Sequence, residues 1–199
     1  MNYVFIPRSS FQRLEIGLSA LNSQLSTLRF RLKLTLSLLA CALASLTSAQ
    51  AQLKAGDVFP QLADAQLTGD VPATAGKILI VDFWASWCAP CKASFPALGK
   101  IAAEYAARGV VLVGVSVDEK ASAYAAFVKK QAPPFVTVHD ARQKLVAAVQ
   151  VPAMPTTYLI GPDGKIRSLH AGYHGEPSDL ELRAGLDAIL TEKNYPLLR

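Results

Sequence analysis

Residue types that bind metal ions are scarce in this chain of 199 residues, which has three cysteines and three histidines. Cys88 and Cys91 form a Cys-x-x-Cys motif, and Cys41 lies far upstream. The histidines are scattered: His139, His170 and His174. A structural zinc site needs four ligands in a tetrahedral arrangement. The sequence therefore argues against such a site, and we expect the three histidines to lie on the surface or in loops.

Net charge is also small once the N-terminal segment is set aside. The whole chain has a formal charge of +5, but residues 1–51 hold five of its Lys and Arg residues and one acid. Residues 52–199 carry 15 basic and 14 acidic side chains, for a net charge of +1. Nucleic-acid-binding domains concentrate positive charge on one face. The sequence therefore gives no indication of a nucleic-acid partner.

The N-terminal segment has the pattern of a secretory leader. The apolar run Leu34 to Ser48 is short for a membrane-spanning helix, which needs about 20 apolar residues. A basic segment, residues 29–33, precedes this run, and the small residues of Ala49-Gln50-Ala51 follow it. This order predicts a signal peptide in residues 1–51 that is cleaved after Ala51.

Two other outcomes remain open for this leader. It could stay attached as an uncleaved membrane anchor. It could also carry a lipid at Cys41, because Leu38-Leu39-Ala40-Cys41 resembles a lipobox. The region before the basic segment is unusually long for a signal peptide, so the true start could lie downstream of Met1.

The most informative stretch runs from Val81 to Lys92, VDFWASWCAPCK. The apolar run 78–84 predicts a strand buried on both faces, and helical spacing of apolar residues begins after Cys91. Cys88 would then lie at a helix N-terminus, where unpaired N–H groups and the helix dipole favour an anion and lower the thiol pKa. The spacing predicts a redox-active pair that can close a small disulfide ring. Half of a zinc site and an inert structural disulfide remain the alternatives.

Residues 52–199 are enough for one domain with a single core. Runs of β-branched residues predict strands at 78–85, 110–117, 135–138, 156–160 and 165–170. Apolar residues at helical spacing predict helices at 89–108, 119–131, 143–149 and from the capping box 178–181 onwards. We also expect Asp118 to cap the second helix and residues 63–67 to add a short edge strand. The order of elements predicts a mixed sheet.

Three motifs resemble the thioredoxin family. Trp87-Cys88-Ala89-Pro90-Cys91 is similar to the WCxPC active site, and Asp82 resembles the buried acid of thioredoxins. Met154-Pro155-Thr156 resembles the segment that carries the cis-proline of the family. The resemblance covers about Lys54 to Glu192. It implies an α/β thioredoxin-like three-layer fold, with a mixed central sheet and helices on both faces, and thiol–disulfide exchange.

Two further segments, residues 114–118 and 155–164, are more similar to the secreted TlpA/ResA branch of the thioredoxin-like superfamily. One departure from that branch is visible. Members of the ResA type often carry a Glu three residues after the second cysteine, where this chain has Ser94. If a carboxylate tunes the thiols here, Asp82 is the remaining candidate.

The resemblance implies roles for individual residues. Cys88 would attack a substrate disulfide, and Cys91 would then attack Cys88 and release the reduced substrate. Asp82 would accept a proton from Cys91, since burial raises the pKa of a carboxyl group. Residues expected to contact substrate are Trp87, Pro90, Met154 and Pro155. The Met154–Pro155 bond is expected to be cis, and Trp84 is expected in the core.

We therefore expect a thiol–disulfide oxidoreductase of the TlpA/ResA type in the periplasm or another extracytoplasmic compartment, where disulfides persist. Its expected activity is reduction of protein disulfides, with cytochrome c maturation as one use. No cofactor is expected, because the Cys88/Cys91 dithiol itself carries the electrons. The expected partners are substrate proteins and a membrane thiol donor. Membrane contact would come only through an uncleaved leader or a lipid at Cys41.

Three other functions use the same cysteines. A disulfide-forming oxidase would differ from a reductase in its redox potential. A metal-binding chaperone would use the two thiolates as ligands, although no histidine lies near them in the sequence. A peroxidase would let Cys88 react alone with small hydroperoxides.

Overall fold

The computed structural model describes residues 52–192. The predictions of a signal peptide in residues 1–51, of cleavage after Ala51 and of a lipid at Cys41 lie outside the described residues. Within residues 52–192, no helix is both long enough and apolar enough to traverse a bilayer. The described residues cover most of the domain predicted for residues 52–199.

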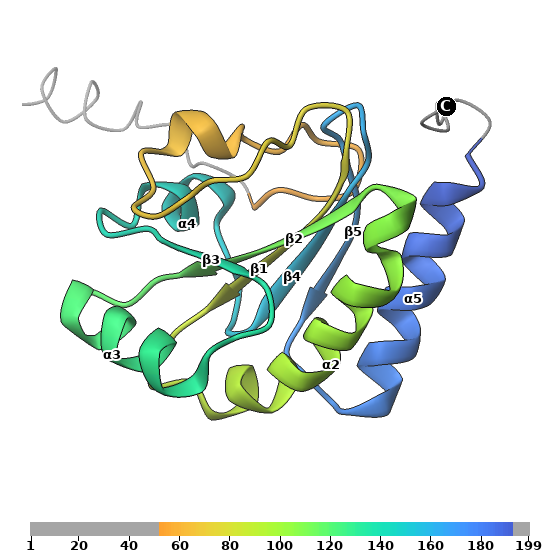
Figure 1. The fold of residues 1–199 in the computed structure, drawn as a ribbon. Coiled ribbons are helices and arrows are strands. Elements are labelled where there is room, and N and C mark those ends of the chain that lie inside the picture. The colour runs from red at the N-terminus through yellow and green to blue at the C-terminus, as the bar shows by residue number, and fades with distance from the viewer. Residues whose placement is uncertain (1–51, 193–199) are drawn as a thin grey trace, which may run out of the picture. The chain divides into compact units, whose positions relative to one another are not determined.

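A five-stranded mixed sheet forms the centre of this domain, with the strand order β3-β2-β1-β4-β5 (Figure 1). The strands are β1 (Ile78–Trp84), β2 (Val110–Ser116), β3 (Val136–His139), β4 (Thr156–Ile160) and β5 (Ile166–Ala171). β1, β2 and β3 are parallel, whereas β4 is antiparallel to β1 and β5 is antiparallel to β4. Parallel neighbours need crossover helices and an antiparallel pair needs only a hairpin. The predicted mixed sheet is confirmed.

Helices cover both faces of the sheet. They are α2 (Ala89–Tyr105), α3 (Ala121–Gln131), α4 (Lys144–Val149) and α5 (Glu176–Leu190). α2, α3 and α5 lie on one face, and α4 with the segment before β1 lies on the other (Figure 1). Successive strand residues point to opposite faces: Trp84 packs edge-on against Phe95 of α2, whereas Phe83 contacts Tyr158, which also contacts Phe59 of the lead-in. The three-layer arrangement predicted from the sequence is confirmed.

The core is densest around β1. All seven residues of this strand are buried, because it lies between β2 and β4 and is covered on both faces. Trp84 is fully buried, as predicted, and its ring lies 4.9 Å from that of Phe127 in α3 and 5.2 Å from that of Phe95. The strand that leads into the cysteine pair is therefore held firmly from both sides.

The helix after the cysteines ends where the sequence predicts. α2 continues through Pro96 to Tyr105, and a 3-10 turn, η2 (Ala106–Arg108), follows it. Gly109 then adopts a left-handed conformation with φ 80°, and its N–H donates to the Ala106 carbonyl at 3.1 Å. Glycine takes this conformation without a steric cost, which explains the stop.

The predicted edge strand at residues 63–67 is wrong. Leu62–Ala65 form a 3-10 helix, η1, and Gln66 after it is left-handed with φ 56°. Ala63 is exposed, so the alternation that suggested a strand does not mark an inward face. Two isolated bridges flank this turn: Val58 pairs with Lys165 before it, and Thr68 pairs with His139 after it.

Two predicted helix caps are also wrong. α3 starts after Lys120 without a side-chain cap, because the Asp118 carboxylate is bonded to the loop before the cysteines instead. α5 begins at Glu176, ahead of the predicted capping box at 178–181. The Ser178 hydroxyl there accepts a hydrogen bond from the His174 N–H at 3.0 Å. In both cases the side-chain oxygen that the sequence pattern predicted as a helix cap accepts its hydrogen bond from a residue outside the helix.

His139 contradicts the expectation of a surface histidine. It ends β3, is 1% exposed, and its ring stacks on Tyr124 with 4.9 Å between ring centroids. Its Nε2 lies 2.6 Å from the Asp118 carbonyl oxygen. A carbonyl only accepts hydrogen bonds, so Nε2 carries the hydrogen. His174 is exposed, as expected, and His170 is partly buried.

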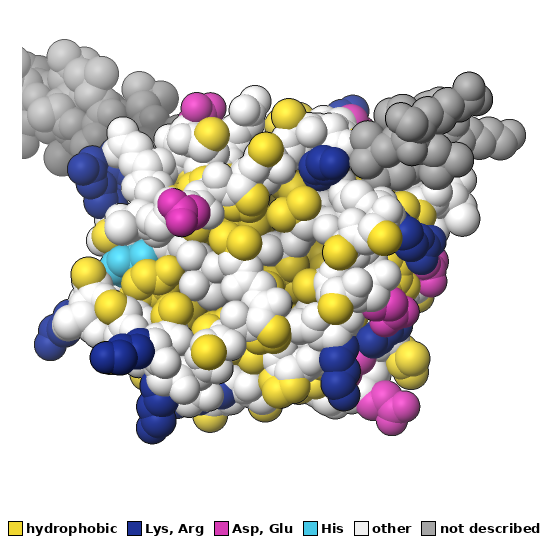
Figure 2. Space-filling model, viewed as in Figure 1, with side chains coloured by type: hydrophobic (Ala, Val, Ile, Leu, Met, Phe, Trp, Pro, Cys, Tyr) yellow, Lys and Arg dark blue, Asp and Glu magenta, His cyan; other side chains and the backbone are white. Residues whose placement is uncertain are grey.

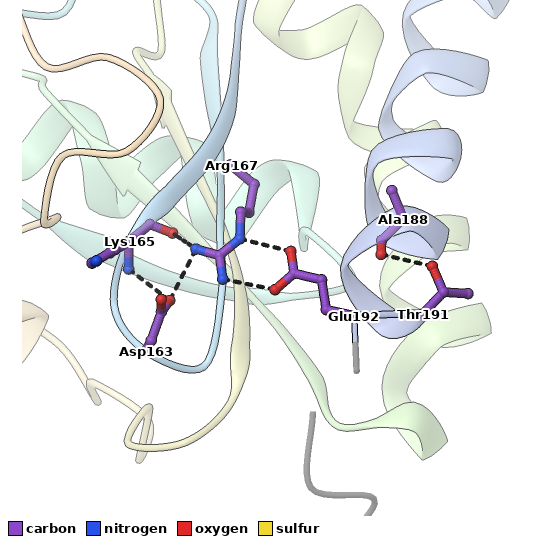
Figure 3. Close-up of polar contacts among 6 residues, drawn as sticks. All are labelled: Asp163, Lys165, Arg167, Ala188, Thr191 and Glu192. Carbon is purple, nitrogen blue, oxygen red and sulfur yellow. Dashed lines mark hydrogen bonds and ion pairs between the residues drawn. The ribbon is translucent and has the colours of Figure 1, made fainter. Parts of the chain in front are cut away.

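An ion-pair cluster around Arg167 joins the C-terminal end of α5 to the β4–β5 hairpin (Figure 3). The guanidinium donates to both carboxylate oxygens of Glu192, at 2.7 and 2.8 Å, and to Asp163 Oδ1 at 2.9 Å. These hydrogen bonds lower the pKa of Glu192 and of Asp163. A Cβ atom on Gly161 would lie 2.7 Å from the guanidinium carbon, so glycine is needed for this packing.

Charged side chains of both signs are scattered over the face shown in Figure 2, mostly around its periphery. The middle of this face is apolar or uncharged. No contiguous patch of one sign is visible on this face.

Candidate active site

A disulfide bond joins Cys88 and Cys91 at the start of α2. Their Cα atoms are 5.4 Å apart, which is usual for a disulfide. Cys88 is 4% exposed and Cys91 is fully buried. Cys88 thus retains a small exposed area, whereas Cys91 retains none.

Cys88 is the N-cap residue of α2. Its backbone is extended, with φ −82° and ψ 107°, and its sulfur accepts a hydrogen bond from the Cys91 N–H at 3.2 Å. Pro90 occupies the first turn, where its missing N–H costs no helical hydrogen bond. The Cys88 sulfur thus lies at the positive end of the helix dipole, which favours a thiolate once the disulfide is reduced.

Asp82 is a fully buried carboxyl group in the middle of β1. Its Oδ1 accepts a hydrogen bond of 2.7 Å from the hydroxyl of Thr157, its register partner on β4. Its Oδ2 has no hydrogen-bond partner among the described residues. Burial raises the pKa of Asp82 to about 7, against the lowering effect of the Thr157 hydrogen bond. Such a group can take up and release a proton near neutral pH.

The side chain of Asp82 lies on the same side of the sheet as α2. Asp82 and Trp84 are two residues apart in one strand, so their side chains share a face. Trp84 packs against Phe95 of α2, and Cys91 is in the first turn of that helix. The carboxyl group therefore faces the layer that contains the buried cysteine.

The loop before the cysteines is fastened to the end of β2 by Asp118. The Ser86 N–H donates to both carboxylate oxygens of Asp118 at 3.1 Å, and the Ser86 hydroxyl donates to Oδ1 at 2.7 Å. The Ser116 hydroxyl adds a bond of 2.8 Å to Oδ2. Asp118 is 2% exposed, so these hydrogen bonds are shielded from water. Asp118 thus holds the backbone two residues before Cys88.

The Met154–Pro155 peptide bond is cis, as predicted. Trp87 is 69% exposed, whereas Met154 is only partly exposed. Both side chains line one cleft of about 540 Å³ beside the disulfide-bearing loop. The structure therefore brings together two of the residues expected to contact substrate, while Pro90 is exposed at the start of α2.

Sequence reasoning missed Ser86, Ser116 and Thr157 as parts of this site. Thr157 lies opposite Asp82 only because β4 pairs with β1 in a particular register. Ser86 and Ser116 meet through Asp118, which lies two residues after the end of β2. Polar residues at the ends of two adjacent predicted strands were a usable signal, since the carboxyl ends of parallel strands meet at one edge.

The ligands that this site could offer to a metal ion are the two sulfur atoms of Cys88 and Cys91. Within residues 52–192, no group of three or more His, Cys, Asp or Glu side chains is placed to hold a metal ion. The arrangement supports another chemistry: a reversible sulfur–sulfur bond, the Cys88 sulfur at a helix N-terminus, and a buried carboxyl group that can exchange a proton.

The model of the AhpC/TSA family matches residues 48–169. The chain belongs to this family. It is also similar to proteins named thiol-disulfide oxidoreductase ResA. It is 32% identical over 126 residues to the ResA of Oceanobacillus iheyensis, covering 60% of this chain and 66% of the relative. It is 35% identical over 97 residues to that of Bacillus subtilis, covering 49% and 54%.

The chain thus spans between about half and two thirds of the length of these relatives. Among solved structures, a protein assigned as the thiol:disulfide interchange protein DsbE of Chlorobium tepidum matches with a TM-score of 0.63 and 29% identity. The match covers 70% of this chain and 99% of that one. These similarities confirm the thioredoxin-like α/β fold and the resemblance to the TlpA/ResA type.

Proposed function

We propose that this protein is an extracytoplasmic thiol–disulfide oxidoreductase that reduces disulfide bonds in partner proteins through the Cys88/Cys91 pair. The observation that carries the proposal is the disulfide at the start of α2, whose first cysteine is 4% exposed and whose second is fully buried. The similarity to proteins named thiol-disulfide oxidoreductase ResA supports it.

The first step starts from the dithiol form of the protein. The Cys88 thiolate attacks one sulfur of the substrate disulfide, whose S–S bond breaks, and the other substrate sulfur leaves as a thiolate. The product is a mixed disulfide between Cys88 and the substrate. The N-terminal end of α2 stabilises the attacking anion, because the Cys91 N–H donates to the Cys88 sulfur and the helix dipole is positive there.

The second step resolves the mixed disulfide. The Cys91 thiol must lose a proton before it can attack, and Asp82 is the buried base on the same side of the sheet. The Cys91 thiolate then attacks the Cys88 sulfur, the Cys88–Cys91 bond forms, and the second substrate thiol is released. Two electrons pass from the protein to the substrate. A thiol donor must return them before the next cycle.

Trapping tests this sequence of steps. Cys91→Ser should accumulate mixed disulfides on Cys88, which non-reducing electrophoresis and mass spectrometry would detect. Cys88→Ser is the matched control, because Cys91 is fully buried and should form far fewer adducts. Equal trapping by both variants, or none by Cys91→Ser while Cys88 can still be alkylated, would contradict the proposal.

The direction of electron flow depends on the redox potential of the pair. We place it on the reducing side, as the similarity to ResA proteins suggests. Equilibration with glutathione measures it. A potential well below about −200 mV supports the reductase, and one above about −150 mV would favour a disulfide-forming oxidase instead.

The compartment and the partners complete the proposal. The leader pattern in residues 1–51 supports export to the periplasm, where a membrane thiol donor would re-reduce the Cys88–Cys91 disulfide. Cytochrome c maturation is the use we propose, since it consumes reduced cysteines outside the cytoplasm. Fractionation of cells that express the tagged full chain tests the compartment, and loss of c-type cytochromes in a deletion strain tests the use.

A further inference from the structure

Asp82 has no direct contact with water, although a base has to exchange its proton with the solvent. The carboxyl group is fully buried, and so is Cys91, whose proton it accepts in the proposed mechanism. The cleft of about 540 Å³ beside the cysteines is not lined by Asp82. A proton that leaves this group without local unfolding must therefore pass through other polar side chains.

The register of the sheet places three polar side chains in one row. Thr157 of β4 pairs with Asp82 of β1 on one side and with His170 of β5 on the other. Directly opposite residues of antiparallel strands point to the same face, and their Cβ atoms lie about 4.5–5.5 Å apart. Asp82, Thr157 and His170 thus follow one another across the face that α2 and α5 cover (Figure 1).

Hydrogen bonds hold both ends of this row. The Thr157 hydroxyl donates to Asp82 Oδ1 at 2.7 Å. At the other end, His170 Nδ1 lies 3.3 Å from Glu181 Oε2 of α5, and its Nε2 lies 2.9 Å from the Ser168 hydroxyl. A carboxylate only accepts hydrogen bonds, so Nδ1 carries the hydrogen and Nε2 is the acceptor in the neutral ring. An imidazole in this state can take up a proton at one nitrogen and release one at the other.

Exposure to water rises step by step from Asp82 to Glu181. Asp82 is 0% exposed and Thr157 is 6% exposed. The side chains of His170 and Glu181 are 20% and 66% exposed. Because β5 is the edge strand, these four residues lead from the middle of the sheet to the surface, and we call them the Asp82 row.

Two helices bring titratable groups to the Asp82 row. α2 contributes Cys91 at its inner end, and α5 contributes Glu181 at its outer end. The strands add the hydroxyls of Thr157 and Ser168, which carry no charge. Gly114 of β2, which lies opposite Asp82, has no side chain. The row therefore offers hydroxyl and imidazole groups, which relay protons, between its two carboxyl groups.

We infer that Thr157, His170 and Glu181 form the route by which Asp82 exchanges its proton with the solvent. The inference rests on the proposed function, in which Asp82 takes the proton of Cys91. The Asp82 carboxyl group passes its proton to the Thr157 oxygen, and the hydroxyl gives up its own hydrogen to His170 Nε2. His170 Nδ1 then releases its hydrogen to Glu181, which releases it to water. Each relay group gains one proton and loses one, so the net change is one proton moved from Asp82 to water.

The route matters most where Asp82 starts with its proton. The pKa of Asp82 is about 7, so at pH 6 the group must lose a proton before it can accept that of Cys91. At pH 8 most of it is already ionised and can accept at once. The slowing caused by a blocked route should therefore appear at pH 6 and disappear at pH 8.

The test mixes the reduced full chain with oxidised glutathione at both pH values. Acid quenching, alkylation and mass spectrometry then follow two species over time. The first is the mixed disulfide of Cys88 with one glutathione, whose formation releases the other glutathione as a thiol. The second is the Cys88–Cys91 disulfide, whose formation releases the second glutathione and completes the transfer of two electrons.

His170→Gln keeps hydrogen-bonding groups at the position but cannot take up a proton. It should slow the second step about tenfold at pH 6 and less than about twofold at pH 8, and leave the first step within about twofold of wild type. In His170→Ala, added imidazole should restore the second step at pH 6. His174 is exposed and lies outside the Asp82 row, so His174→Gln is the matched control and should behave as wild type.

Carbon NMR of the Asp82 carboxyl group in the oxidised protein separates a lost route from a lost charge. The pKa of Asp82 should be the same in His170→Gln as in wild type. A change in this pKa that accounts for the slowing, equal slowing at both pH values, or no slowing would overturn the inference while the oxidoreductase activity stands. If His170→Gln does not fold, His170→Ala with and without imidazole decides. Failure of the wild-type protein to form the Cys88–Cys91 disulfide would overturn the proposed function and the inference with it.

Discussion

Asp82 should make the stability of the oxidised protein depend on pH in a particular direction. Its pKa is raised from 3.8 to about 7 because the carboxyl group is buried. Between these two values the folded protein keeps the proton that the unfolded chain releases. The folded state then binds more protons than the unfolded state, so this group lowers the free energy of unfolding as the pH rises. The decrease in the free energy of unfolding is complete above about pH 7 and has not begun below about pH 4.

The magnitude follows from the size of the change in pKa. Each pKa unit is worth 1.36 kcal/mol, so the full effect is at most about 4 kcal/mol. Asp82→Asn removes the titrating group and keeps an acceptor for the Thr157 hydroxyl. The free energy of unfolding of the variant, relative to that of the wild type, should therefore rise by up to about 4 kcal/mol as the pH is raised from 4 to 8.

Urea unfolding of the oxidised protein at half-unit steps of pH measures this difference. The disulfide keeps the two thiols from titrating in the same range. Asp70→Asn, which replaces an exposed carboxyl group, is the matched control and should run parallel to wild type. Parallel curves for Asp82→Asn and wild type would refute the reasoning, because they would mean that Asp82 ionises in the folded protein as it does in the unfolded chain.

Three further changes test the structure around the site and the core. Asp118→Ala should leave the Ser86 hydroxyl and N–H without their buried acceptor, cost about 2–4 kcal/mol in urea unfolding, and slow alkylation of reduced Cys88 by at least about twofold. Gly99→Ala should destabilise by about 1–3 kcal/mol, although alanine favours helix by about 1 kcal/mol, because its Cβ would overlap the Pro134 ring. A stabilised Gly99→Ala protein would contradict that packing. Arg167→Ala should cost less than about 1 kcal/mol, and the cost should shrink in high salt, because the ion pairs are partly exposed.

The sequence alone determined the features that depend on neighbouring residues. The apolar run of β1 has no polar alternation, and a strand with that pattern is buried on both faces in the structure. The change from strand to helical spacing put Cys88 at a helix N-terminus, and Gly109 marked the end of the same helical region. These signals are local, because they follow from backbone geometry and from the periodicity of side chains.

Tertiary structure alone decided which distant groups meet. Asp118 looked like a helix cap, yet its carboxylate bonds to Ser86, 32 residues away in the chain. His139 had no local signal of burial, and it is buried because β3 lies beside β2 and Tyr124 stacks on its ring. The hydrogen bond from Thr157 to Asp82 depends on the register between β4 and β1. A side-chain oxygen bonds to the nearest suitable donor in space, and only the folded chain decides which donor that is.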